Sequence, residues 1–211
     1  PMTIEILRKT GSTTPMPYGS NLPEGAEIVG DSGIRLPDER IYQFDWNPAG
    51  AQSFFLSSYL PSFDINSAEL EMYDTYRSYA GWQYTTLPEN QLLRFRENFE
   101  EAQYILSGDI LSYSFDLEPV PEGQDIIEYF VFEQQKGYCM HFASAYALAY
   151  RMTGLPARYA SGYLVLPRDF ERNEDGTYTA VVREERAHAW TEIFRGPFGW
   201  TYLEATPPSY Y

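Results

Sequence analysis

The chain is poor in cysteine and in positive charge. Among 211 residues it has one cysteine, so no disulfide can form within it, and that count does not identify a redox compartment. It has 15 basic and 30 acidic residues, which give a formal net charge of -15. No stripe of basic residues is available to follow a phosphate backbone. We therefore expect no nucleic-acid partner.

Long apolar runs are also missing. No run approaches the roughly 18 residues that cross a bilayer, and no basic segment followed by an apolar one opens the chain as a signal peptide would. The sequence begins with Pro1 and Met2 and stops directly after a predicted strand, as an excised piece of a larger protein would. We expect contact with a membrane only through segments outside this sequence.

The residues that are abundant suit a packed core. Hydrophobic residues make up 44% of the chain, aromatic residues 17% and charged residues 21%, which is typical of a globular protein and not of a disordered one. The length fits one large domain or two small ones. Of the basic residues only two are lysines, so the chain has few primary amines of its own.

The N-terminal part predicts a β-rich segment followed by linker helices. Residues 1–62 contain short β-prone runs separated by loops with proline and glycine, and this small β module need not be complete. We assign residues 63–104 to linker helices. Apolar residues at three-residue spacing predict one helix over residues 65–80, and start signals at residues 86–90 predict a second that reaches Tyr104.

The segment 105–211 predicts an α+β domain. After a short strand at 113–117, a helix over 126–132 begins at the capping residue Asp125, and a second helix over 139–153 ends at Gly154. Four strands are then predicted, at residues 158–166, 178–183, 187–194 and 199–204. The turn signal Asp175-Gly176 favours antiparallel pairing of the first two.

Cys139 is the candidate nucleophile because it opens the second of these helices. Unpaired N–H groups and the positive end of the helix dipole lower the pKa of a thiol at that place. The backbone N–H of Cys139 can also donate a hydrogen bond to the oxyanion of a tetrahedral intermediate. A lone cysteine is more often a buried structural thiol, so the assignment depends on partner residues.

His188 and Glu204 are the candidate partners, on consecutive predicted strands. If those strands form a hairpin, the two side chains come within hydrogen-bond reach. A carboxylate that holds one ring nitrogen leaves the other to accept the thiol proton. Singly, His188 also fits a structural histidine and Glu204 a solvated strand end. Trp190 shares the face of His188 and is a candidate for lining an acyl channel, although a large aromatic on a sheet is more often core.

Five ordered blocks resemble the bacterial transglutaminase-like core family. They are residues 137–145 (GYCMHFASA), 154–158 (GLPAR), 161–163 (SGY), 187–192 (AHAWTE), and 199–200 (GW) with 204–207 (EATP). The resemblance implies a papain-like α+β fold, in which the nucleophile-bearing helix packs on an antiparallel sheet, and it implies a Cys-His-Asp thiol site at Cys139, His188 and position 204. The family pattern usually has Asp at the third position. Glu204 is one methylene longer and can still orient His188.

The resemblance also implies a location and a reaction. Members are often extracytoplasmic parts of membrane proteins, so we expect an extracytoplasmic domain of a membrane-anchored bacterial protein. As an enzyme, the chain would form a thioester at Cys139 with a carboxamide or peptide carbonyl of a protein or peptide. An amine would resolve the thioester in a transglutaminase, and water in a protease or amidase. The alternative is a catalytically degenerate module that binds protein or peptide, which the departure at Glu204 favours.

Other side chains near these motifs have simpler interpretations. His141 lies two residues after Cys139 on a helix, so the two side chains point about 200 degrees apart and cannot share one metal ion. Gln134 or Gln135 could donate to an oxyanion, but the spacing selects neither. The acidic loop at 171–176 lacks the spaced oxygen ligands of a calcium site and predicts a solvated hairpin tip. We expect neither a metal nor a cofactor.

Overall fold

The computed structural model describes residues 2–6, 25–29, 33–36, 41–44, 87, 92–194 and 200–207. The chain divides into two compact units, Pro1–Leu56 and Ser57–Tyr211. Within the described residues no helix is both long and apolar enough to span a membrane. The helix predicted over 65–80 lies outside the described residues, as does the segment 195–199 between the two strands expected to form a hairpin.

In its described residues, the first unit contains two antiparallel strand pairs. Its strands are β1 (Met2–Glu5), β2 (Glu27–Val29), β3 (Gly33–Arg35) and β4 (Ile41–Phe44), with β1 paired to β4 and β2 paired to β3. Leu36, Tyr42 and Phe44 form a small buried cluster. The alternating burial of β4, in which every second residue is buried, is the pattern of a strand with one covered face.

The second unit begins, in its described part, with two short helices where one was predicted. These are α4 (Leu93–Glu97) and α5 (Phe99–Ser107). The break falls at Asn98, whose side-chain amide donates to the carbonyl of Arg94 at 2.9 Å. A side chain that bonds the backbone in this way competes with helix continuation, so the single long helix was wrong at this residue.

Asp125 caps the next helix as predicted. Its Oδ1 accepts the backbone N–H groups of Ile127 and Glu128 at 2.8 and 3.1 Å. The helix is α6 (Ile126–Tyr129), and it continues into a π-helical segment, η2 (Phe130–Gln134). The chain then forms β6 (Lys136–Gly137), which pairs in parallel with β5 (Ser112–Tyr113). The strand predicted at 113–117 is thus shorter than expected and begins one residue earlier.

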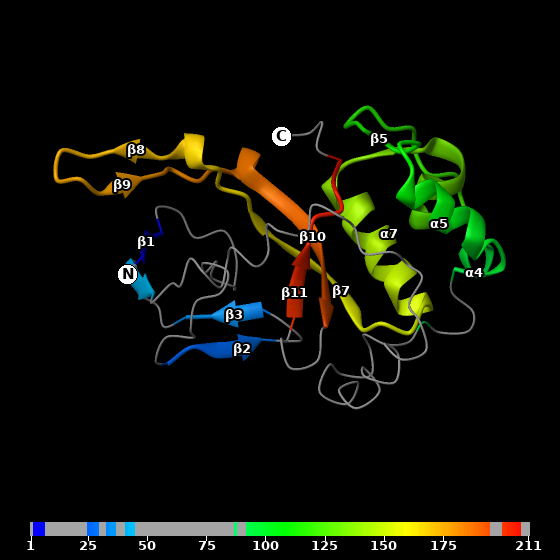
Figure 1. Cartoon of the computed structure of the whole chain (residues 1–211), viewed down its shortest axis with the longest axis horizontal. Helices are drawn as coiled ribbons and strands as arrows, with labels where there is room; N and C mark the ends of the chain where they lie inside the picture. Colours follow the sequence, from blue (N-terminus) through cyan, green and yellow to red (C-terminus); the bar gives the residue numbers. More distant parts are fainter. Residues whose placement is uncertain are drawn as a thin grey trace. The chain divides into compact units, whose positions relative to one another are not determined.

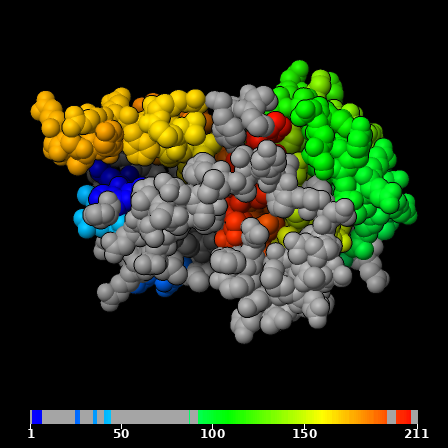
Figure 2. All heavy atoms as spheres, viewed as in Figure 1, coloured from blue at the N-terminus to red at the C-terminus, as the bar shows by residue number. Residues whose placement is uncertain are grey.

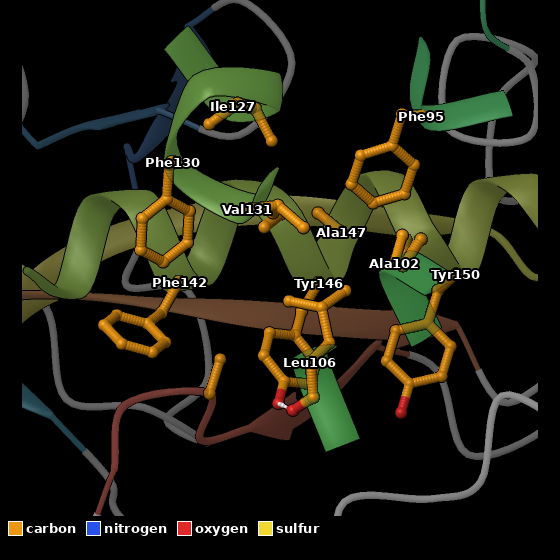
Figure 3. Close-up of a cluster of buried hydrophobic side chains, with 14 of the residues drawn as sticks. Phe95, Ala102, Leu106, Ile127, Phe130, Val131, Phe142, Tyr146, Ala147 and Tyr150 are labelled. Atoms are coloured by element: carbon orange, nitrogen blue, oxygen red, sulfur yellow. Dashed lines mark hydrogen bonds between the residues drawn. The ribbon is translucent and has the colours of Figure 1, made fainter. Parts of the chain in front are cut away.

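The helix α7 (Cys139–Met152) is the centre of the core and confirms the helix predicted over 139–153. Figure 3 shows its aromatic side chains meeting those of the preceding helical segments. Phe142 packs edge-on against Phe130 with ring centroids 5.1 Å apart, and the Tyr146 hydroxyl donates to the carbonyl of Leu106. The helix ends where Gly154 adopts φ +89, a conformation that favours glycine.

A three-stranded antiparallel sheet packs against α7 (Figure 1). Its order is β11-β10-β7, formed by β7 (Ala157–Tyr163), β10 (Ala187–Phe194) and β11 (Trp200–Leu203). On the face toward the helix, the Thr191 hydroxyl donates to the carbonyl of Ala143 at 2.9 Å. The predicted pairing of the strands that carry His188 and precede Glu204 is confirmed.

The predicted pairing between strands 158–166 and 178–183 was wrong. Residues 178–183 contribute only β9 (Tyr178–Thr179), which pairs with β8 (Glu171–Arg172), while β7 pairs with β10. The turn lies in this hairpin, closed by the Gly176 N–H donating to the Asn173 carbonyl at 3.1 Å, with Gly176 at φ +85. Because a short helical turn, η3 (Pro167–Asp169), intervenes, the two runs cannot form one continuous hairpin. In Figure 2 the β8–β9 hairpin, in yellow and orange, lies at the opposite end of the second unit from the green helices.

Candidate active site

Cys139 is the first residue of α7 and is 8% exposed. It packs with Ala143 of the same helix and with Ala189 of β10, so the helix N-terminus lies against the central strand of the sheet. Gly137 permits this close turn into the helix. A Cβ on Gly137 would come within 2.7 Å of the Phe130 ring and 2.8 Å of the Cβ of His141, distances that real Cβ atoms do not show.

His141 helps to build the start of α7. Its Nδ1 accepts the backbone N–H of Tyr138 at 3.4 Å, and the two rings meet edge to face at 4.5 Å. Burial lowers the pKa of His141 below its usual range, outweighing the Tyr138 backbone, which raises it. The neutral ring is the form that can accept this hydrogen bond. His141 is therefore a buried capping residue, as its packing interpretation predicts.

His188 lies near the start of β10, opposite Gly162 of β7. It is 4% exposed, and its Nε2 donates to Oε2 of Glu204 at 2.9 Å. Glu204 therefore occupies one ring nitrogen, and the thiol of Cys139 lies near enough to His188 for each group to shift the pKa of the other. The structure thus brings together the three residues predicted from the sequence.

Cys139 and His188 shift each other's pKa in opposite directions: the pKa of His188 is raised and that of Cys139 is lowered. Burial acts to lower the pKa of His188, but the hydrogen bonds and charges of Cys139 and Glu204 outweigh it and raise the pKa to about 9. Burial acts to raise the pKa of Cys139, but His188 and the backbone of Ala189 and Met140 outweigh it and lower the pKa. This arrangement stabilises a thiolate next to an imidazolium.

Glu204 is held by more than His188. Its Oε2 also accepts the hydroxyl of Tyr202, and its Oε1 accepts the backbone N–H of Thr206 at 2.8 Å. Sequence reasoning missed Tyr202 and Thr206. The available signal was spacing, because residues two apart on a strand share a face, and Tyr202 precedes Glu204 by two positions.

Trp190, a candidate for lining an acyl channel, lies beside the histidine. The two rings stack with centroids 6.4 Å apart, and the indole Nε1–H donates to Glu192 Oε1 at 3.3 Å. Glu192 is itself paired with Arg158 at 2.6 Å. A Cβ on Gly162 would meet the Trp190 ring at 2.9 Å, so a glycine at this position makes room for the indole. Its role as a channel residue stays a prediction.

Gln134 is used in local structure. Its Nε2 donates to the carbonyl of Lys136 at 3.1 Å, and its Oε1 accepts the backbone N–H of Glu118 at 2.9 Å. The side-chain amide of Gln134, a candidate donor to an oxyanion, is therefore used to hold the backbone next to β6. Gln135 adopts φ 52 at the end of η2. Within the described residues no group of three or more His, Cys, Asp or Glu side chains is arranged to hold a metal ion.

Comparison with known proteins assigns this chain to a family. Residues 90–205 match the model of the transglutaminase-like superfamily, and the chain belongs to that superfamily, whose chemistry is thiol-dependent acyl transfer. It is 34% identical over 94 residues to a protein-glutamine gamma-glutamyltransferase of Pseudomonas aeruginosa, a match that covers 44% of this chain and 13% of the relative. It is 30% identical over 102 residues to the uncharacterized protein YebA of Bacillus subtilis, covering 48% of this chain and 14% of that protein.

Solved structures agree on the fold. The periplasmic domain of TgpA from Pseudomonas aeruginosa, in its crystal structure bound to ethylmercury, superposes with a TM-score of 0.56 at 21% identity. The superposition covers 92% of this chain and 68% of the other. The predicted α+β fold, a transglutaminase core of papain-like type, is confirmed. The chain spans only about one seventh of the curated relatives it matches.

Proposed function

We propose that this chain is a cysteine-dependent acyltransferase in which Cys139 is the nucleophile, His188 the general base and acid, and Glu204 the carboxylate that orients His188. The observation that carries the proposal is the grouping of these residues, in which Glu204 accepts the Nε2–H of His188 at 2.9 Å and Cys139 and His188 shift each other's pKa. The opposed pKa directions of Cys139 and His188 supply the charge state that such a nucleophile needs.

The geometry supports an order of proton transfers. The Cys139 thiolate attacks the carbonyl carbon of a carboxamide, and the tetrahedral oxyanion lies at the start of α7, where the first N–H groups of a helix have no intrahelical partner. As the intermediate collapses, the imidazolium of His188 gives its proton to the departing nitrogen, and a thioester remains. The acceptor then loses its proton to His188, attacks the thioester, and releases the Cys139 thiolate.

The acyl acceptor is either an amine or water. An amine would make the reaction a transamidation, and water would make it hydrolysis of an amide. The relative from Pseudomonas aeruginosa that is a protein-glutamine gamma-glutamyltransferase favours an amine. Burial of His188 and its stacking with Trp190 shield one side of the imidazole from water, which agrees with that choice. We propose a protein or peptide as the acyl donor.

The parent protein would hold this domain outside the cytoplasm. A solved relative of the fold is the periplasmic domain of TgpA, and the sequence itself resembles extracytoplasmic domains of membrane-anchored proteins. We propose the same placement for this chain, with any anchor outside it.

Trapping of the thioester tests the proposal directly. The protein is incubated with a glutamine-containing peptide, with and without a fluorescent alkyl amine, and its intact mass is followed by mass spectrometry. We expect an acyl adduct on Cys139 that the amine discharges into a labelled peptide, and no adduct on Cys139→Ala. An acyl adduct that is released only by hydrolysis, with no labelled peptide, would indicate amidase activity. Absence of any adduct across glutamine peptides and other peptide amides would favour the degenerate binding module.

A further inference from the structure

The Glu204 carboxylate accepts hydrogen bonds from two groups besides His188. Both of its oxygens are engaged, because Oε2 accepts from His188 Nε2–H and from the Tyr202 hydroxyl, while Oε1 accepts the Thr206 N–H. We propose that Tyr202 is a positioning residue, which fixes the Glu204 carboxylate against His188. This inference rests on the proposed function, because it names a residue that acts through the orienting carboxylate.

The Tyr202 side chain is well placed for this task. Tyr202 lies on β11 directly opposite Glu192 of β10, and its ring packs against Trp190 with centroids 5.7 Å apart. Trp190 in turn stacks with His188. The Tyr202 ring is therefore held by the same indole that lies beside the imidazole, and its hydroxyl reaches the carboxylate from a fixed position.

The need for such a residue follows from the length of Glu204. A glutamate has one more rotatable bond than an aspartate, so an orienting glutamate loses more side-chain freedom when it is held in one conformation. The backbone N–H of Thr206 fixes one oxygen, and the Tyr202 hydroxyl fixes the oxygen that faces His188. A hydrogen bond to a charged carboxylate is among the stronger ones in proteins, so together they confine Glu204 to the conformation that meets the imidazole.

Replacing Tyr202 by phenylalanine tests the positioning role. Tyr202→Phe keeps the ring that packs on Trp190 and removes only the hydroxyl. We expect kcat to fall by roughly ten- to a hundredfold with KM changed less than about twofold, because substrate contacts are left in place. We also expect the pKa of His188 to fall, since a loosely held carboxylate stabilises the imidazolium less. The chain has two histidines, so the imidazole C–H signals can be assigned by NMR with one substitution at His141.

Two matched variants isolate the effect. Tyr178→Phe removes the hydroxyl of a tyrosine that is 63% exposed on the β8–β9 hairpin, and it should leave kcat and the pKa of His188 unchanged. In a Glu204→Ala background, Tyr202→Phe should add almost nothing, because two residues that act through one contact are not additive.

The outcomes separate this inference from the proposed function. If the wild-type protein has no raised His188 pKa and forms no thioester, the proposed function fails. If the wild type has both but Tyr202→Phe keeps full kcat, or has a His188 pKa that is unchanged or raised, only the positioning role of Tyr202 is wrong. An equal loss from Tyr202→Phe in the Glu204→Ala background would also contradict it.

Discussion

At the scale of single residues, the charge of the site depends on His188. It lies between a buried thiol and a carboxylate, and both neighbours favour its protonated form strongly enough to overcome burial and to raise its pKa to about 9. Removing the negative charge of Glu204 should therefore lower the pKa of His188 and weaken the thiolate–imidazolium pair.

Glu204→Gln is the substitution that tests this dependence. The amide nitrogen of glutamine cannot accept the His188 Nε2–H, and the side chain has no charge. By analogy with the triad carboxylates, we expect turnover to fall by roughly 10²–10⁴-fold and the pKa of His188 to move down from about 9. The measurements are steady-state kinetics and an NMR titration of the imidazole. Glu184→Gln, at an exposed position on η4, is the matched control, and equal losses in both variants would contradict the role of Glu204.

The pH dependence of turnover follows from the same two groups. The Cys139 thiolate predominates above the lowered pKa of the thiol, and the His188 imidazolium predominates below about pH 9. The ion pair is thus populated between these limits, so activity should rise as pH passes the lowered pKa of Cys139 and decline as pH passes about 9. Rates of peptide acylation across this range measure it. A rate that keeps rising well above pH 9 would show that the imidazolium is not required. Because the two groups titrate together, the limits belong to the pair.

At the scale of elements, a buried ion pair links the strands of the sheet. Arg158 of β7 donates to Glu192 of β10 at 2.6 Å, and its guanidinium lies 4.1 Å from the ring centroid of Trp200 on β11. Glu192 is 4% exposed. Removing the arginine would leave a buried carboxylate without its cation, which is far more costly than the loss of a surface pair.

Arg158→Ala should therefore lower the free energy of unfolding by about 3–5 kcal/mol. Arg94→Ala is the control, because the Arg94–Glu133 pair is exposed and such pairs contribute about 1 kcal/mol or less. Chemical denaturation of both variants gives the comparison. Similar small losses in the two would mean that the Arg158–Glu192 pair does not stabilise the sheet.

The turn that precedes α7 requires a glycine at position 137. Gly137→Ala would place a Cβ within 2.7 Å of Phe130 and 2.8 Å of His141, and overpacking of this kind costs about 1–3 kcal/mol of stability. Because the same turn places Cys139, the alkylation rate of the thiol should change as well. Gly108→Ala is the control, since its nearest contact, at 3.2 Å, is less severe. Equal unfolding free energies for wild type and Gly137→Ala would show that the turn relaxes freely.

Local signals made some of these elements predictable. Asp125 precedes one apolar run and caps the start of α6, and Gly154 follows another and ends α7. Both positions agree with the prediction. The break at Asn98 and the passage of α6 into a π-helical segment carry no such signal, because they result from side-chain contacts and packing. The partner of β7 was also misassigned, since strand pairing is decided by contacts distant in sequence.

The candidate site was predictable to a similar degree. Cys139, His188 and Glu204 could be named because each sits at a helix start or a strand position whose chemistry is visible in the sequence. Their contacts with one another depend on the fold, and the resemblance to the family supplied that fold. Tyr202 and the Thr206 N–H were not predicted, because the two-residue spacing of Tyr202 and Glu204 indicates only a shared strand face and does not specify a hydrogen bond.

At the scale of the whole molecule, the site residues all belong to the second unit, Ser57–Tyr211. The chain carries a formal net charge of -15 and two lysines, so it has few primary amines of its own that could act as acyl acceptors. In transamidation the acceptor would then come mainly from another molecule, and a positively charged amine would be attracted by the net negative charge.

The proposed mechanism requires Cys139 to exist as a thiolate paired with the imidazolium of His188. The rate of Cys139 alkylation by iodoacetamide as a function of pH measures it most directly, in the wild type and in His188→Ala. We predict an apparent pKa well below the usual value of about 8.5 for a free thiol in the wild type, and loss of that shift in the variant. A thiol that titrates at or above the usual value in both proteins would rule out the thiolate–imidazolium pair.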